Sequence, residues 1–175
     1  MGLNPRIAVE RLDSGEARIG KIIELIQDSK YAIHDLSRIK AQKRGEYFRL
    51  NMPLELGIDI GCKLFGTGRK SKKMCLVLVA ENYKYQAAIS DLSNSDVGVH
   101  KNSPYETVVV VRNWLNNSCG LMADGPAKIW DTFNEFMADN YAELSSRGFS
   151  KKDIENLEII ELMNSMMGWV KARGP

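Results

Sequence analysis

Cysteine and histidine are scarce in this chain, and their scarcity restricts its chemistry. The three cysteines, Cys62, Cys75 and Cys119, are odd in number and lack the spacing of metal ligands. Together with the two histidines, His34 and His100, they do not form the pattern of a metal site. We therefore predict no bound metal, and we interpret the cysteines as reduced thiols of a cytoplasmic protein.

Long apolar runs and a strong charge of one sign are also missing. No apolar run approaches the roughly 18 residues of a membrane-spanning helix, and no signal peptide opens the chain. The formal net charge of +2 is too small to indicate nucleic-acid binding, although basic residues cluster at 38–49 and 69–73. The sequence shows no internal repeat and no low-complexity segment. These absences favour a soluble protein without a membrane or nucleic-acid partner.

The rest of the composition, 44% hydrophobic and 26% charged residues, is that of an ordinary globular protein. Apolar, β-branched runs predict strands at residues 5–10, 31–34, 73–80 and 97–100. Helical periodicity predicts helices at residues 16–28, 53–65, 83–90 and 104–115. This alternation predicts an α/β fold, with a three-layer, Rossmann- or flavodoxin-like parallel sheet in a domain of residues 1–118.

The helix at 104–115 is predicted against a contrary local signal, since it contains four consecutive valines. Its length and its Ser103-Pro104 start decide in favour of a helix. Residues 119–175 are predicted to form a helical extension with two amphipathic helices, at 126–145 and 151–173. Ser150 is the predicted cap of the second.

The stretch with the clearest functional character lies where the strand at 31–34 ends. Asp35 and Ser37 follow the strand directly, and a polar loop then leads to a helix that opens at Asn51 to Pro53. Glu55 is predicted to lie in the first turn of that helix. In open α/β sheets ligands bind beyond the carboxyl ends of the strands, so we expect a ligand crevice at this corner.

Each of these residues also has a purely structural interpretation. Glu55 could simply complement the helix dipole, and Asp35 and Ser37 could be turn residues that bond their own backbone. His34 and His100 are interpreted as structural histidines. The segment 66–71 resembles a phosphate loop only superficially, because it lacks the Walker spacing and precedes a strand.

The corner carries a family resemblance. A strand end with aspartate, a variable loop and then N-x-P-x-E-L-G at a helix start resemble the superfamily of nucleoside 2-deoxyribosyltransferases and Toll/interleukin-receptor (TIR) domains. A group of uncharacterised bacterial TIR-like proteins is more similar still, over roughly residues 3 to 118. The segments that carry this resemblance are RLDSGEARIGKIIELIQDSKYAIHDLSR, NMPLELGIDIG and YQAAISDLSNSDVGVH.

The resemblance implies roles for two carboxylates. A glutamate at the corresponding helix start is the catalytic carboxylate of these families, and it matches Glu55. The strand-end aspartate binds substrate in the deoxyribosyltransferases, and it matches Asp35. Proteins of this group usually have another strand and helix before the segment matching 4–10, and that strand lies in the middle of the sheet. We therefore expect an N-terminally incomplete sheet and, because its edge would be unpaired, a homo-oligomer.

Two functional hypotheses follow. The first is an enzyme that hydrolyses or transfers at the N-glycosidic bond of a nucleotide or nucleoside, with NAD as the first candidate substrate and no further cofactor. Glu55 would stabilise the developing oxocarbenium ion or form a glycosyl ester. Asp35 and Ser37 would hold ribose hydroxyls, and the basic residues Arg38 and Arg49 would contact phosphates. Asn51 is a further predicted substrate-binding residue. The second hypothesis is a nucleotide-sensing or scaffolding module without turnover, in bacterial defence.

Overall fold

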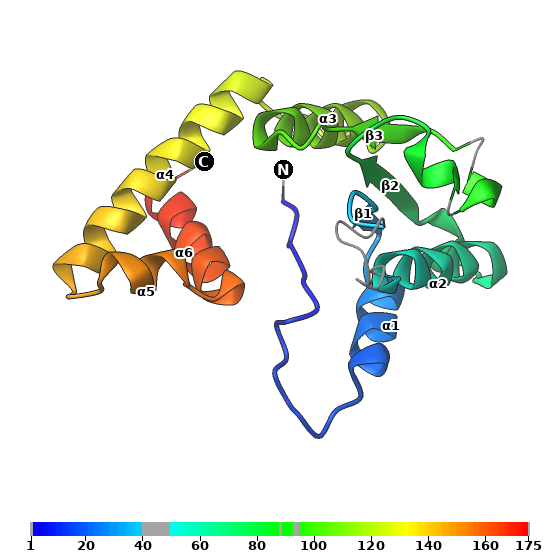
Figure 1. Cartoon of the computed structure of the whole chain (residues 1–175), viewed down its shortest axis with the longest axis horizontal. Helices are drawn as coiled ribbons and strands as arrows, with labels where there is room; N and C mark the ends of the chain where they lie inside the picture. The colour runs from blue at the N-terminus through cyan, green and yellow to red at the C-terminus, as the bar shows by residue number, and fades with distance from the viewer. Residues whose placement is uncertain (1, 40–49, 88, 93–94, 175) are drawn as a thin grey trace. The chain divides into compact units, whose positions relative to one another are not determined.

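The structure, a computed structural model, describes residues 2–39, 50–87, 89–92 and 95–174. The chain forms two compact units, Met1–Ala123 and Asp124–Pro175 (Figure 1). The first unit contains the sheet, and the second is helical. No helix in the described part of the chain is long and apolar enough to cross a membrane.

The first unit is built on three parallel strands in the order β1-β2-β3. Their bounds are β1 (Tyr31–Asp35), β2 (Met74–Val79) and β3 (Val97–Val99). His34 lies opposite Val77, which in turn lies opposite Val97, so these three side chains share one face of the sheet. Ile33 and Leu76 are paired on the other face. The prediction of an α/β fold with a parallel sheet is confirmed.

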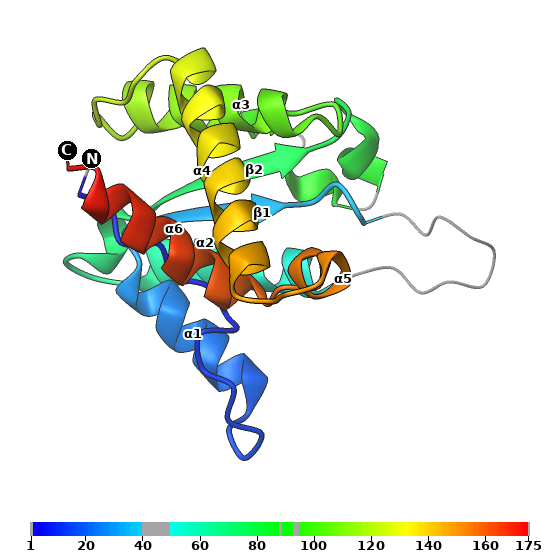
Figure 2. The same cartoon turned by 90° about the vertical axis from the view of Figure 1, so that its left-hand side faces the viewer.

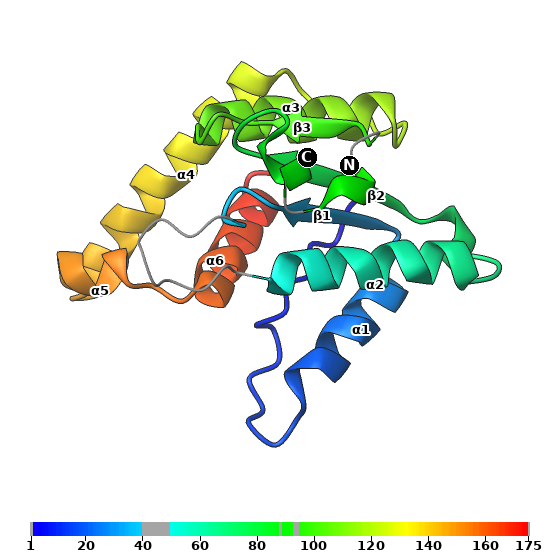
Figure 3. The ribbon, with the colours of Figure 1, turned by 45° about the vertical axis from the view of Figure 1, so that its right-hand side comes forward.

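Helices cover both faces of this sheet (Figure 3). The helices α1 (Arg18–Asp28) and α2 (Asn51–Phe65) pack together, and α2 lies on the His34 face, where Asp59 reaches His34. The opposite face carries α3 (Pro104–Asn117). A methyl group at Gly98 would lie 2.3 Å from Cγ1 of Val110, so glycine allows α3 to approach β3 closely. The core on the α2 face contains Leu36, Ile39, Leu56, Val77, Val79 and Tyr85.

The helix starts follow local chemistry, with two shifts from the predicted bounds. Ser103 caps α3 by accepting a hydrogen bond from the Glu106 amide, which confirms the predicted start. The helix α1 begins at Arg18, two residues later than expected, because the Asp13 carboxylate accepts the Gly15 amide and folds the preceding segment into a turn. The helix α2 begins before Pro53, so Glu55 is its fifth residue and not part of its first turn.

Two predicted elements of this unit are wrong. Residues 5–10 form no strand; a turn closes there with a hydrogen bond from the Glu10 amide to the Ile7 carbonyl, 3.1 Å long. A strand needs a paired neighbour, and β1 pairs only with β2 among the described residues. The helix predicted at 83–90 is replaced by two 3₁₀ turns, η2 (Lys84–Ala87) and η3 (Ser90–Leu92); another, η1 (Lys70–Lys72), precedes β2.

The described residues of the second unit form three helices where two were predicted. These helices are labelled in Figure 2. They are α4 (Pro126–Ser146), α5 (Lys151–Glu155) and α6 (Ile159–Ala172). Ser150 caps α5 as predicted, in a reciprocal capping box with Asp153. Asn156 ends α5 because its side-chain amide bonds the Lys152 carbonyl. Trp169 of α6 packs edge-on against Phe136 of α4 and donates its indole N–H to Asp139.

Candidate functional site

The site begins at Asp35, the last residue of β1, which folds the chain back on itself. Its Oδ1 accepts the backbone N–H of Ser37 at 2.9 Å, the local bond expected of an aspartate that starts a turn. The amide of Leu36 still donates to Leu78 at 2.8 Å, so the turn stays attached to β2. The Asp35 side chain remains 53% exposed and is available to a ligand.

His100 reaches the same place from the end of β3. Its backbone N–H donates to the Val79 carbonyl at 3.0 Å, and its carbonyl accepts the Ser103 amide at 2.8 Å. The turn between them places Lys101 and Asn102 at φ values of 53° and 56°. This left-handed conformation is uncommon for lysine, and such backbone strain clusters at functional sites. The turn leaves His100 only 7% exposed.

Asp35, Ser37 and His100 form one hydrogen-bonded cluster at the carboxyl edge of the sheet. Ser37 Oγ lies 2.5 Å from Oδ1 of Asp35 and 2.6 Å from Nε2 of His100. The same Nε2 lies 3.5 Å from Oδ1 of Asp35. The structure thus brings together two predicted site residues and one, His100, that was interpreted as structural. Its position at the carboxyl end of a strand, like that of Asp35, is the signal that could have identified it.

The cluster has the residue types of a nucleophilic triad but not its connections. In such a triad the carboxylate holds one nitrogen of the imidazole and the serine bonds the other. Here Asp35 bonds the serine itself, and both residues lie at the same nitrogen of His100. The Ser37 hydroxyl donates its hydrogen bond to the Asp35 carboxylate and not to the imidazole. The cluster therefore holds Asp35 in place rather than activating Ser37 as a nucleophile.

Glu55 lies on α2, and its surroundings differ from those of Asp35. It is half-buried, and this burial raises the pKa of Glu55, although His34 and Arg18 oppose the shift electrostatically. No hydrogen bond or ion pair with another described residue connects Glu55 to Asp35 or Ser37. A ligand would have to bridge the two carboxylates.

The remaining predicted binding residues take no part in the described cluster. Arg38 and Asn51 are exposed, and neither side chain forms a hydrogen bond or ion pair with another described residue. Arg49 lies outside the described residues. The contacts of Arg38 and Arg49 with phosphates, and the binding of substrate by Asn51, stay predictions.

A second polar cluster, formed by His34, Asp59 and Lys73, is buried beneath α2. Asp59 Oδ2 lies 3.1 Å from His34 Nε2, and Oδ1 lies 3.2 Å from Lys73 Nζ without a hydrogen bond to any described residue. The Lys73 ammonium also donates to the carbonyls of Ile26 and Ser29 at the end of α1. Burial alone would raise the pKa of Asp59, but His34 and Lys73 outweigh it, so that pKa is lowered.

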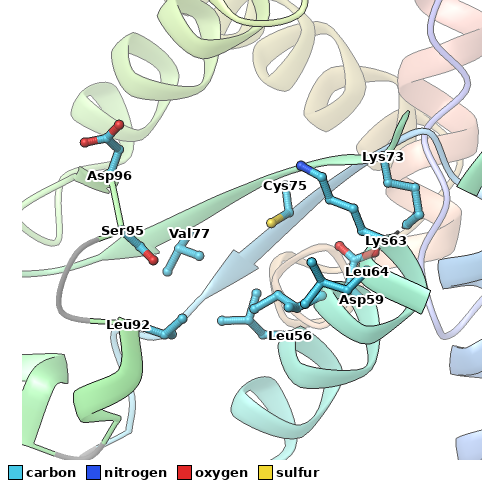
Figure 4. Close-up of a pocket in the computed structure, with 11 residues that line it drawn as sticks. Leu56, Asp59, Lys63, Leu64, Lys73, Cys75, Val77, Leu92, Ser95 and Asp96 are labelled. Atoms are coloured by element: carbon cyan, nitrogen blue, oxygen red, sulfur yellow. Dashed lines mark ion pairs between the residues drawn. The ribbon is translucent and has the colours of Figure 1, made fainter. Parts of the chain in front are cut away.

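A pocket of about 360 Å³ lies beside this buried cluster, not at the carboxyl edge of the sheet. Figure 4 shows Cys75 and Val77 of β2 and Leu56 and Asp59 of α2 along its walls. The Asp59 carboxylate there is already paired with Lys73. We place the functional site at the carboxyl edge because Asp35 keeps an exposed, uncommitted oxygen there, whereas the pocket wall pairs its buried charges.

The described residues were also compared with what a disulfide or a metal site requires. Cys62, Cys75 and Cys119 are free thiols. Among the described residues, no group of three or more His, Cys, Asp or Glu side chains is placed to hold a metal ion.

The comparisons found no family model, no curated protein and no solved structure that matches this chain. The resemblance to TIR-like proteins and deoxyribosyltransferases therefore stays a prediction.

Proposed function

We propose that this chain binds a nucleotide or nucleoside at the carboxyl edge of a Rossmann- or flavodoxin-like sheet. The observation that carries the proposal is the exposed Asp35 carboxylate, held by Ser37 beside His100. Oδ1 is occupied by these contacts, while Oδ2 accepts no hydrogen bond from any described residue. An acidic acceptor at this edge suits a ribose hydroxyl.

We further propose that the reaction takes place at the N-glycosidic bond, with NAD as the first candidate substrate. The bond from the anomeric carbon to the base nitrogen breaks, and the base leaves with the electron pair. Glu55 either stabilises the resulting oxocarbenium ion while water attacks or forms a glycosyl ester that water or another acceptor then displaces. Its half-buried position supports this role, because a charge acts more strongly where water is partly excluded.

One observation favours a second candidate, a nucleotide-sensing or scaffolding module without turnover. Glu55 has no described link to the Asp35 cluster, and its described electrostatic neighbours are His34 and Arg18. Binding through Asp35 would then proceed without a carboxylate at the glycosidic bond. This candidate predicts nucleotide affinity without release of a base.

The experiment separates binding from turnover. Wild type, Asp35→Asn and Glu55→Gln are titrated calorimetrically with NAD and with nucleosides, and release of nicotinamide or free base is followed by chromatography. Asp35→Asn should weaken binding, because it removes an acceptor used in the ground state, whereas Glu55→Gln should abolish release and retain affinity. Exposed acids of the second unit supply the matched controls, Asp131→Asn and Glu161→Gln.

The outcomes assign the function. Base release that survives Glu55→Gln removes this residue from the mechanism. Affinity without release in the wild type favours the sensing module. Absence of affinity for every nucleotide and nucleoside tested overturns the proposal.

A further inference from the structure

The Asp35 cluster fixes the direction of its own hydrogen bonds. An ionised carboxylate only accepts, and a serine hydroxyl has a single proton to donate. The 2.5 Å contact between Ser37 Oγ and Asp35 Oδ1 uses that proton, because no other hydrogen can occupy it. Ser37 Oγ must then accept at its other contact, 2.6 Å from His100 Nε2. The imidazole therefore carries a hydrogen on Nε2.

This chain of donors ends on one oxygen of Asp35. Oδ1 receives the Ser37 hydroxyl and the Ser37 amide, and the Nε2–H of His100 lies 3.5 Å away. His100 itself cannot move aside easily, since it is buried and its backbone is held at both sides by Val79 and Ser103. The His100 end of this row of hydrogen bonds is thus buried and held in place, and the Asp35 end presents a carboxylate to solvent.

We propose that His100 is a positioning residue: through Ser37 it fixes the Asp35 carboxylate so that Oδ2 faces the ligand. This inference rests on the proposed function and narrows its substrate class. An oxygen that only accepts requires a donor from the ligand, so the ligand carries a free ribose hydroxyl at that point. A phosphate ester there would place two negative groups together and would be rejected.

The first test needs no ligand. The chain has only two histidines, so ¹⁵N spectra of labelled protein at pH 8 are readily assigned with the His100→Gln variant. The Nε2–H tautomer is expected for His100, and the Asp35 carboxyl ¹³C signal should move in His100→Ala and stay in place in His100→Gln, whose amide can donate from a similar position. A neutral His100 with its hydrogen on Nδ1, or an Asp35 signal indifferent to His100→Ala, overturns the inference.

The second test measures discrimination between AMP and 2′,3′-dideoxy-AMP by calorimetry. Wild type should prefer AMP by roughly ten- to a hundredfold, the range for a hydrogen bond to a charged group. His100→Ala and Ser37→Ala should each reduce that preference severalfold while leaving the affinity for the dideoxy compound within about twofold. His100→Gln should retain the preference. Ser37→Ala provides the answer if His100→Ala does not fold, because it breaks the same chain without opening a buried cavity at His100.

A purely structural role for His100 gives a different pattern. It would lower the affinity for both nucleotides equally, or make His100→Gln as weak as His100→Ala, and either result overturns the inference. If wild type binds neither nucleotide, the proposed function fails and the ligand half of this inference fails with it. The tautomer and the Asp35 signal still decide whether His100 positions Asp35.

Discussion

Two adjacent residues, His34 and Asp35, belong to polar clusters with opposite characters. His34 faces α2 and joins Asp59 and Lys73, a cluster in which every residue is at least 95% buried. Asp35 ends the strand, and its carboxylate joins Ser37 and His100 while remaining about half exposed. Strand alternation directs the two side chains apart, and the end of the strand gives the second one access to solvent.

The comparison shows how to separate structural from functional polar groups. In the buried cluster each charge is paired, and Lys73 additionally satisfies two carbonyls at the end of α1. In the carboxyl-edge cluster, bonds converge on one carboxylate oxygen and leave the other one uncommitted among the described residues. Buried charges that pair with one another indicate a role in stability, whereas a carboxylate that is held in place and still exposed to solvent indicates a place for a ligand.

The largest expected effect is the loss of the buried carboxylate. Asp59→Ala leaves the Lys73 ammonium buried without its counter-charge, which should lower the free energy of unfolding by about 3–5 kcal/mol. Asp35→Ala should lower it by less than about 1 kcal/mol, because its site is exposed. Urea unfolding followed by circular dichroism measures both. Similar losses in the two variants would erase the distinction between the clusters.

A smaller decrease in the free energy of unfolding is expected when the close contact between β3 and α3 is disturbed. Gly98→Ala places a methyl group against Val110 and forces α3 away from β3, at a cost of about 1–3 kcal/mol. Gly57→Ala is the matched control in α2, where a methyl group meets nothing within 4 Å. It should raise the free energy of unfolding by up to about 1 kcal/mol. The expectation fails if the two substitutions act in the same direction.

Acid should affect the buried cluster through Asp59. Because the pKa of Asp59 is lowered in the folded state, its contribution to stability is present above the unfolded pKa, about 3.9, and is lost as pH falls through the folded pKa. Unfolding free energies measured from pH 7 down to pH 2 should therefore fall below about pH 4. In Asp59→Asn, which is less stable at pH 7, that fall should be shallower. An unchanged slope would remove Asp59 from the acid response.

The smallest expected effect is a slight gain in stability, and it concerns Glu55. Burial raises the pKa of Glu55, so the folded state disfavours its ionised form, and this cost appears as pH rises through the folded pKa. Glu55→Gln removes the cost, so its thermal midpoint at pH 8 should equal or slightly exceed that of the wild type. Asp131→Asn, an exposed control, should leave the midpoint unchanged. A clear drop in Glu55→Gln would indicate a structural role for this carboxylate.

Local signals in the sequence predicted the elements that local chemistry decides. The apolar run at 73–80 gave β2, and the Ser103-Pro104 start gave α3 in spite of its four valines. Apolar character alone did not suffice at residues 5–10, because a strand depends on a partner that may be far away in sequence. The break at Asn156 was missed because it depends on one side chain bonding its own turn.

The candidate site was predictable in part for the same reason. Asp35 and Ser37 are close in sequence, and their bond is a local turn. The contact between Ser37 and His100 spans 63 positions, and no periodicity reports it. The burial of Lys73 could not be predicted either, because a lysine normally lies at the surface. Its buried ammonium is stabilised by Asp59 and by the distant carbonyls of Ile26 and Ser29.

The Lys73 ammonium has a consequence for how the first unit opens. One side chain connects the last turn of α1, the middle of α2 through Asp59, and the residue before β2. If one of these segments separates from the others, the Lys73 ammonium loses hydrogen bonds to α1 or its ion pair with Asp59. Amide protons of α1 and α2 should therefore exchange with deuterium through a shared opening, with a common protection free energy, rather than by independent fraying of each helix.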